Sequence, residues 1–319
     1  MLKQYTAMLV ALGLAIVWGQ SVWAQSLSLS SDEMQQLAAY SFGQSRQLLS
    51  DIEEKVKLSI TDSKAKCALA AQLSGILMLD GASRESKDFV CRQLALIGGA
   101  SEVRVLEKLL RDPATADMAR YALERIPEEE VDRVLLDALD YTEGYLKIGV
   151  VNSLANRRSP QAVKPLSAFA SGEDELIAEA AIAGLGRIGL TKSHAALLKL
   201  VKKVPVSRQD KVLEALLFSA DAMGESRRAF RAYSTVYQYA QNPTTKAAAL
   251  YGLVKNSSYP KNVSWILKGV ESGDRYQLAA MRRAIRETHD ERTKKRLFEV
   301  AAQLTPEKRD IVFDALKGN

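Results

Sequence analysis

The feature that most constrains this chain is a repeat that recurs seven times. One aliphatic residue marks each copy, and successive markers are 29, 31, 31, 31, 37 and 32 residues apart. A spacing this steady predicts one small structural unit used repeatedly, rather than a single core assembled from unlike parts. We call these seven residues the anchors: Leu94, Leu123, Leu154, Leu185, Leu216, Leu253 and Ile285.

A second apolar column lies four residues before the anchors, and positions four apart share one face of a helix. In the first four copies a leucine also follows the anchor by twelve residues. Each copy therefore predicts a hairpin of two short helices, which buries its apolar face only when hairpins stack. The earlier column is Val90, Ala119, Val150, Ala181, Val212, Ala249 and Met281, and the later leucines are Leu106, Leu135, Leu166 and Leu197.

These patterns predict an all-α fold: a right-handed α-solenoid, or ARM-like superhelix, of about seven short helical hairpins with helical caps at both ends. The 8 prolines and 18 glycines are too few for the many turns of an all-β protein. We expect the repeats in residues 63–304, with caps in residues 25–62 and 305–319. The segment from Ser31 to Ile60 predicts one long helix or a kinked pair. The register after Leu216 is open, because Arg228 stands where a leucine is expected.

The ending Leu185-Gly186-Arg187-Ile188-Gly189 resembles the short HEAT repeats of phycobilisome lyase subunits. Further stretches, at residues 40–46, 87–94, 118–127 and 149–154, are similar to a group of secreted bacterial HEAT-repeat proteins. The likeness covers residues 35–200 well and the remainder loosely. It implies the ARM-like superhelix and carries no assigned activity.

The first 24 residues have the pattern of an export signal. Lys3 supplies the positive charge, Ala7 to Val17 form a short apolar core, and Val22-Trp23-Ala24 places small residues at a cleavage site before Gln25. The alternative is a membrane anchor that is never cut. No cysteine is near enough for a lipid anchor, and no later segment is apolar for long enough to span a bilayer. We expect a periplasmic or secreted protein without a transmembrane span in the mature chain.

An oxidising compartment would permit the two cysteines, Cys67 and Cys91, to bridge. They fall on expected antiparallel helices around the turn at residues 80–83. At 1.5 Å per residue, Cys67 lies about 18 Å from that turn and Cys91 about 12 Å. The difference of about 6 Å between these two distances is near the upper limit of the separation that a disulfide can bridge. Two alternatives stay open: a bridge, or two small buried thiols that pack as hydrophobes.

Residues that could carry chemistry are few. His194 occupies a repeat position that holds Val103 and Val163 in other copies, so we expect it to be packed, and His289 lies in a polar turn, where we expect it to be solvated. Neither cysteine has the spacing of a zinc ligand, and acidic pairs such as Glu128-Glu129 lie at expected helix starts. We predict a non-catalytic protein without cofactor or metal. The alternative is an accessory subunit of an enzyme.

Charge divides the chain. Residues 1–186 hold 19 Lys and Arg against 25 Asp and Glu, whereas residues 187–319 hold 25 against 13. A surface of one sign steers partners of the opposite sign. Outside the cytoplasm, an anionic membrane surface, an acidic polysaccharide or an acidic protein is a better candidate than nucleic acid. The alternative is that these side chains only solvate the protein.

A solenoid without catalytic motifs favours a protein-interaction scaffold. In HEAT-type repeats the helix with the Leu-Gly-x-Ile-Gly ending lines the inner face, so the resemblance places a partner there. Residues two before each anchor are rotated about 200° from it and face outward. They could instead be structural, and Tyr121 could be a core residue. This minus-two column is Arg92, Tyr121, Asn152, Ala183, Glu214, Tyr251 and Arg283, of which all but Ala183 are candidate partner-binding residues.

The export signal makes a direct prediction. Protein purified from the envelope of the producing cell should begin at Gln25, because signal peptidase cuts after small residues that follow a short apolar core. Intact-mass spectrometry would measure this. A chain that keeps Met1 and stays with the membrane would show an anchor instead.

Overall fold

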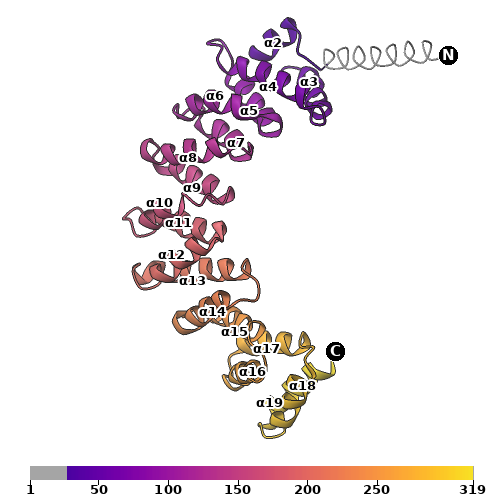
Figure 1. Cartoon of the computed structure of the whole chain (residues 1–319), viewed down its shortest axis with the longest axis vertical. Helices are drawn as coiled ribbons and strands as arrows, with labels where there is room; N and C mark the ends of the chain where they lie inside the picture. Colours follow the sequence, from indigo (N-terminus) through magenta and orange to yellow (C-terminus); the bar gives the residue numbers. More distant parts are fainter. Residues whose placement is uncertain (1–26, 319) are drawn as a thin grey trace, which may run out of the picture. The chain divides into compact units, whose positions relative to one another are not determined.

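The computed structural model describes residues 27–318, and all regular structure in that range is α-helical. Eighteen helices, α2 to α19, follow one another without a strand between residues 27 and 318 (Figure 1). The predicted all-α solenoid is confirmed. The export signal at residues 1–24 and the cleavage site before Gln25 lie outside the described residues. None of the described helices is long and apolar enough to cross a membrane.

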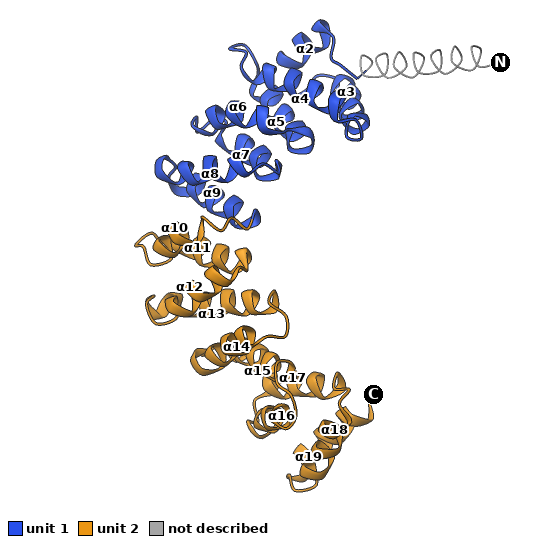
Figure 2. Cartoon of the chain, viewed as in Figure 1, with its two compact units in different colours: residues 1–157 blue, residues 158–319 orange. Residues whose placement is uncertain are grey.

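The chain divides into two compact units, one ending at residue 157 and the other starting at residue 158 (Figure 2). Unit 1 contains α2 (Ser31–Ala38), α3 (Gln47–Ser59), α4 (Ser63–Leu77), α5 (Arg84–Ile97), α6 (Ala100–Leu110), α7 (Ala116–Arg125), α8 (Glu129–Tyr141) and α9 (Gly144–Asn156). Unit 2 contains α10 (Val163–Phe169), α11 (Glu175–Ile188), α12 (Thr191–Leu200), α13 (Val206–Asp221), α14 (Arg227–Tyr239), α15 (Pro243–Lys255), α16 (Lys261–Glu271), α17 (Arg275–Arg286), α18 (Glu291–Ala301) and α19 (Pro306–Lys317).

The repeat appears in the structure as a buried stripe. All seven anchors are 0% exposed, and the residues four before them are at most 1% exposed. The anchors lie on α5, α7 and α9 in unit 1 and on α11, α13, α15 and α17 in unit 2, and we call these the first helices. The four leucines twelve residues after an anchor are also fully buried. They lie on the second helices, which are α6, α8, α10, α12, α14, α16 and α18.

Each unit packs its helices in two layers. In unit 1, α5 contacts α7 and α7 contacts α9, while α6 contacts α4 and α8. In unit 2, α11 contacts α13 and α15 contacts α17 in the first-helix layer, while α10 contacts α12 and α16 contacts α18 in the other layer. First helices therefore present one face of each unit and second helices the opposite face.

The structure explains why both glycines of the motif Leu185-Gly186-Arg187-Ile188-Gly189 are needed. A Cβ atom on Gly186 would lie 2.9 Å from the carbonyl oxygen of Ala215 and 3.1 Å from its Cα, so only glycine allows α11 to approach α13 this closely. Gly189 ends α11 with a φ of +64°, a left-handed conformation that favours glycine at a helix end.

The register after Leu216 is resolved by the structure. Helix α14 begins at Arg227, eleven residues after its anchor, whereas α6 begins at Ala100, six residues after Leu94. Arg228 is exposed as a consequence. Different residues of α14 face the core: Ala229, Ala232, Tyr233 and Val236. The original spacing returns in the last copy, where Leu297 follows Ile285 by twelve residues and is 0% exposed.

Additional helices cover both ends of the repeats. The segment from Met34 to Ile60 forms two separate helices, α2 and α3, joined by the ion pair of Lys55 with Glu33 at 2.7 Å. Phe42, in the turn between them, is 79% exposed, so helical spacing alone overstates the buried face there. At the other end α19 packs on α17 and α18 and buries Val312.

The two cysteines are not bridged. Cys91 lies on α5, is 0% exposed and packs as a hydrophobe. Cys67 lies on the exposed side of α4 and is free. Neither of the two open alternatives is found in this structure, because the thiols are not bridged and only one of them is buried. The physical reason is that distance from a turn does not decide which face of its helix a residue occupies: Cys91 lies on the buried face of α5, and Cys67 lies on the exposed face of α4.

Two glycine substitutions test the packing. Gly186→Ala should lower the free energy of unfolding by about 1–3 kcal/mol, because the added methyl group meets the backbone of α13. Gly75→Ala in α4 is the matched control, since a methyl group added there would meet nothing within 4 Å, and it should raise the free energy of unfolding by about 0.4–1 kcal/mol. Urea unfolding of the full chain would measure both. Equal effects would contradict the close approach of α11 and α13.

Candidate partner-binding face

The structure places the minus-two column on the outward side of the first helices. Arg92, Ala183, Glu214 and Arg283 are exposed, and Asn152 and Tyr251 are half-buried. Tyr121 is 38% exposed and is therefore not a core residue. A rotation of about 200° from a buried anchor explains this arrangement. Whether the column binds a partner stays a prediction.

In unit 1 much of the first-helix face is occupied by its own polar contacts. The Ser153 hydroxyl donates to Glu124 at 2.6 Å and accepts from Arg120 at 2.9 Å, and the Asn156 amide donates to Glu124 at 3.0 Å. These bonds join α7 to α9. The Arg125 guanidinium lies 3.7 Å from the ring centre of Tyr121. The face of α7 and α9 is thus largely satisfied from within.

At the start of unit 1, Arg92 lines a small pocket of about 160 Å³ together with the exposed Phe42. Arg92 is itself paired with Asp88 at 3.0 Å. The pocket is also lined by Tyr40, Arg46, Leu49, Glu85 and Phe89.

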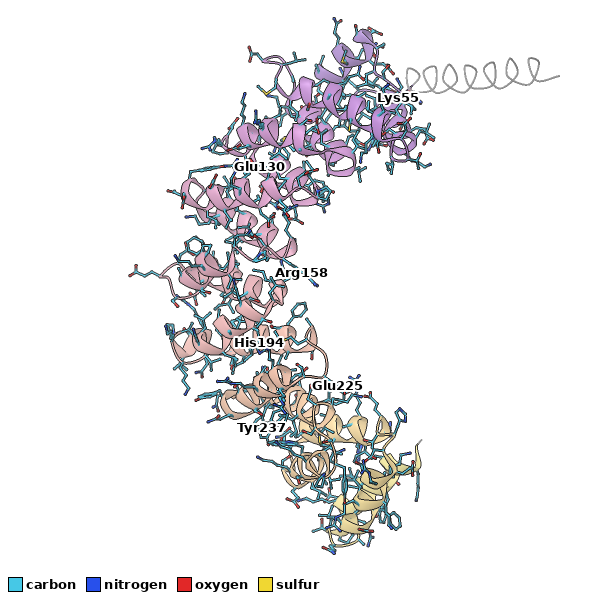
Figure 3. All side chains as sticks on the ribbon, in the orientation of Figure 1. Lys55, Glu130, Arg158, His194, Glu225 and Tyr237 are labelled. Carbon is cyan, nitrogen blue, oxygen red and sulfur yellow. The ribbon has the colours of Figure 1, made fainter. Side chains whose placement is uncertain are left out.

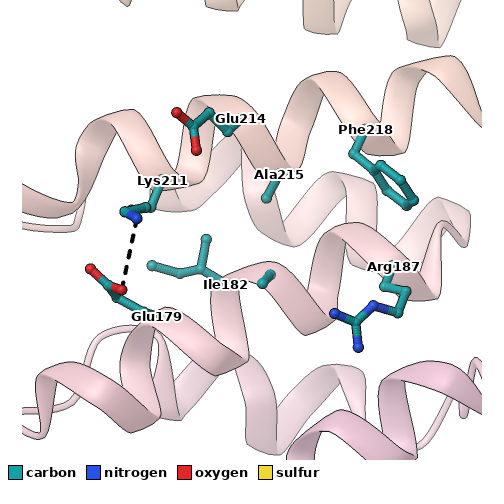
Figure 4. A pocket seen from close by; sticks show the side chains of 8 residues that line it. Glu179, Ile182, Arg187, Lys211, Glu214, Ala215 and Phe218 are labelled. Atoms are coloured by element: carbon teal, nitrogen blue, oxygen red, sulfur yellow. Dashed lines mark ion pairs between the residues drawn. The ribbon is translucent and has the colours of Figure 1, made fainter.

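In unit 2, residues of the minus-two column line open grooves. The first groove, of about 350 Å³, runs between α11 and α13 and includes Ala183 and Glu214 (Figure 4). Lys211 and Glu179 close one end at 3.9 Å, and Arg187 and Phe218 lie at the other end. The Phe218 ring is 58% exposed, so the groove offers an apolar contact beside charged groups.

A second groove, of about 530 Å³, extends over α13, α15 and α17 and includes Tyr251 and Arg283. The Tyr233 hydroxyl donates to Asp221 at 2.5 Å, which joins α14 to the end of α13. Asp221 and Glu225 put negative charge in this groove, and Lys255 and Arg283 put positive charge there.

Tyr251, Arg283 and Glu287 form one hydrogen-bonded cluster beside this groove. Arg283 Nε donates to Glu287 at 2.8 Å, and the Tyr251 hydroxyl donates to the other carboxylate oxygen. The Arg283 guanidinium also lies 4.7 Å from the ring centre of Tyr251. The bonds from Arg283 and Tyr251, with Lys255 at 3.6 Å, lower the pKa of Glu287 to about 2. The Glu287 carboxylate is therefore charged at neutral pH, and the three side chains hold one another in place.

Sequence reasoning missed a second column on the same side of the first helices, two residues after the anchors; in unit 2 two of its members are exposed and two are half-buried. In unit 2 this plus-two column is Arg187, Phe218, Lys255 and Glu287, and each of these residues lines a groove on the first-helix face. The signal was available, because positions minus two and plus two are four apart and share one face of a helix. Phe218 was the clearest sign, as a phenylalanine at an outward position.

The two histidines lie in different surroundings. His194 is 2% exposed inside unit 2, and its Nδ1 lies 3.1 Å from the Ser219 hydroxyl, which confirms a packed position (Figure 3). His289 is exposed, as expected. Within residues 27–318, no group of three His, Cys, Asp or Glu side chains could hold a metal ion.

Comparison with known proteins agrees with the architecture. Residues 133–216, about a quarter of the chain, match the sequence model of HEAT repeats, so this part of the chain is similar to repeats of that kind. No curated protein matches the chain in sequence. Among solved structures, the crystal structure of an engineered protein aligns over 91% of this chain and 89% of that one, with 17% identity and a TM-score of 0.38, and a likeness this weak supports no further conclusion.

The buried His194 predicts a pH dependence of stability. Burial, with Arg228 and Arg231 nearby, lowers its pKa below the usual value of about 6.5. Below that pH the unfolded chain takes up the proton more readily than the folded chain, so stability is full above about pH 6.5 and falls as the pH drops towards the folded pKa.

Melting temperatures between pH 7.5 and 5 would measure this effect. His194→Gln should flatten the decline relative to wild type, whereas the control His289→Gln, at an exposed position, should leave it unchanged. A decline that is the same in all three proteins would contradict the assignment to His194.

Proposed function

We propose that this chain is a non-catalytic scaffold that binds a protein partner along the first-helix face of unit 2. One observation carries the proposal: in that unit, residues at both outward columns line grooves instead of bonding only to each other. Ala183, Glu214 and Phe218 line one groove, and Tyr251 and Arg283 line the next. HEAT-repeat solenoids in general suggest interaction rather than catalysis, and the match at residues 133–216 supports the comparison.

The chemistry of these grooves suits a protein surface. Tyrosine and arginine concentrate binding energy at interfaces because they combine a large contact area with directed hydrogen bonds. Here Tyr251 and Arg283 are held by Glu287, so little conformational entropy is lost when a partner binds. The exposed Phe218 adds an apolar contact in the neighbouring groove.

The place of action is part of the proposal. The charged start, short apolar stretch and small-residue site in residues 1–24 support export to the periplasm or the medium. The resemblance to secreted bacterial HEAT-repeat proteins supports the same compartment.

A second candidate function is attachment to an anionic surface of the envelope through the basic part of the chain. Residues 158–319 hold 27 Lys and Arg against 17 Asp and Glu, whereas residues 1–157 hold 17 against 21. Exposed charges are screened beyond about 8 Å at physiological ionic strength. Binding to vesicles that contain phosphatidylglycerol should therefore weaken steeply between about 50 and 300 mM salt, and salt-independent binding would count against this function.

Photo-crosslinking would identify the partner and the face together. A photoreactive amino acid at Ala183 or Ala248, both on the first-helix face, should give a covalent adduct in the producing cell. The same amino acid at Gln238, an exposed residue of the second helix α14, is the control and should give none.

With the partner in hand, alanine should replace Arg92, Tyr121, Tyr251 and Arg283 singly and together. We expect Tyr251→Ala and Arg283→Ala to weaken affinity about tenfold or more, with a small change in melting temperature. Arg92→Ala and Tyr121→Ala act on unit 1 and test whether the partner extends there. Lower stability with unchanged affinity would show that the column is structural.

A further inference from the structure

Two long stretches of unit 2 contain no carboxylate side chain. Residues 180–209 hold six Lys and Arg, and residues 226–270 hold seven, without a single Asp or Glu. Away from the ends of these stretches, the basic groups have no carboxylate among their close neighbours in the sequence. A positively charged site therefore exists only where these basic groups also lack an ion pair with carboxylates from other parts of the fold.

The second-helix face of unit 2 concentrates such unpaired groups in one place. A groove of about 650 Å³ lies between α10 and α12, and four lysines line it: Lys164, Lys192, Lys199 and Lys203. All four are exposed, and none is within ion-pair distance of a carboxylate in residues 27–318. We call this site the lysine groove.

No acidic side chain takes part in the lysine groove. Its other lining residues are apolar or neutral: Pro160, Gln161, Val163, Ser167, Ser171, Ala195, Ala196 and Leu200. The Ser167 hydroxyl donates to the carbonyl oxygen of Val163 at 2.6 Å and is satisfied there. The lining thus combines alanine, valine and leucine side chains, which we call the apolar floor, with four lysines.

The positive charge follows the length of α12. Lys192 lies in its first turn and Lys199 in its last, seven residues later, which corresponds to a rise of about 10 Å. Lys203 follows the helix end, and Lys164 contributes from α10. Unit 1 differs, since Arg133 there is paired with both Glu130 and Asp137. Like charges gathered without partners repel each other, and an external anion would relieve this repulsion.

We propose that the lysine groove binds an acidic, amphipathic segment of a partner protein. Carboxylates of such a segment meet the lysines, while its apolar side chains cover the floor formed by Val163, Ala195 and Leu200. An acidic polysaccharide is less suited, because no aromatic ring lines the groove as a stacking surface for sugars. A membrane is less suited because surface helices enter lipid with large apolar side chains, and these lysines surround a hollow instead.

This inference is independent of the proposed first-helix face. The lysine groove lies on the opposite layer of unit 2, and the two sets of lining residues share no member. A scaffold with two usable faces can hold two partners, or two parts of one partner. Loss of one interaction would leave the other measurable.

The test uses the full chain and a defined probe. The probe is a fluorescent peptide of about 16 residues of glutamate, leucine and alanine, ordered so that an α-helix carries glutamates on one face and leucines on the adjacent face. A scrambled peptide of the same composition, polygalacturonate and phosphatidylglycerol vesicles are tested alongside. The groove variant is Lys192→Glu with Lys199→Glu. The control variant is Lys295→Glu with Lys317→Glu, which makes the same charge change at exposed positions of α18 and α19.

We expect the ordered peptide to bind wild type and the control variant with affinities within about threefold, and the groove variant on the order of tenfold or more weakly. Circular dichroism of both variants should match wild type, which separates lost binding from lost folding. Should the groove variant be misfolded, Lys199→Gln and Lys203→Gln provide a milder change with the same expected direction.

Three results would overturn the proposal. The first is equal peptide binding by the groove and control variants. The second is equal binding of the ordered and scrambled peptides, which would mean that charge alone acts and the apolar floor is unused. The third is binding of polygalacturonate or vesicles, lost in the groove variant, with no binding of the peptide, which would assign the groove to a different class of macromolecule.

Discussion

The contact on which this structure depends is the packing of each anchor, with the residue four before it, against the neighbouring hairpin. A short helix cannot bury an apolar stripe against itself, so each hairpin is stable only beside the next. All fourteen residues of the two columns are at most 1% exposed. Truncating a buried leucine in such a stripe leaves a cavity that costs about 2–5 kcal/mol. The close approach of Gly186 to Ala215 shows how little space the stack leaves between first helices.

Because the stripe uses only one side of each first helix, the other side is free to vary without loss of the core. The two units use this freedom differently. Unit 1 fills that side with contacts between repeats, such as Arg120 and Glu124 with Ser153, which hold α7 against α9. Unit 2 leaves grooves there, lined by side chains such as Phe218 and Tyr251. The same repeat therefore gives a largely self-satisfied outward face on α7 and α9 of unit 1 and open grooves on that side of unit 2.

Charge also differs between particular sites of the two units. In unit 1, Arg133 is paired with both Glu130 and Asp137. In unit 2, α12 carries Lys192 and Lys199, and neither is within ion-pair distance of a carboxylate in the described residues. Exposed ion pairs contribute little to stability, so a solenoid loses little stability when its exposed basic side chains have no carboxylate to pair with. Such a surface is free to be positive, and the groove between α10 and α12 gives that charge a shape that an acidic segment of another protein can match.

The sequence by itself determined the helical class, the anchors, the buried column four residues before them and the outward direction of the minus-two column, because all of these follow from the 3.6-residue period of one helix. It placed His194 in the core for the same reason.

Tertiary structure alone decided the features that depend on two helices at once. The later start of α14 exposed Arg228 and buried Tyr233 in place of a leucine, and the rotation of α4 against α5 left Cys67 exposed while Cys91 is buried. Likewise, only packing between α10 and α12 turned four scattered lysines into one groove. A repeat period fixes which face of a helix is apolar, whereas the distance and rotation between neighbouring helices depend on how particular side chains fit, and no spacing along one chain specifies that fit.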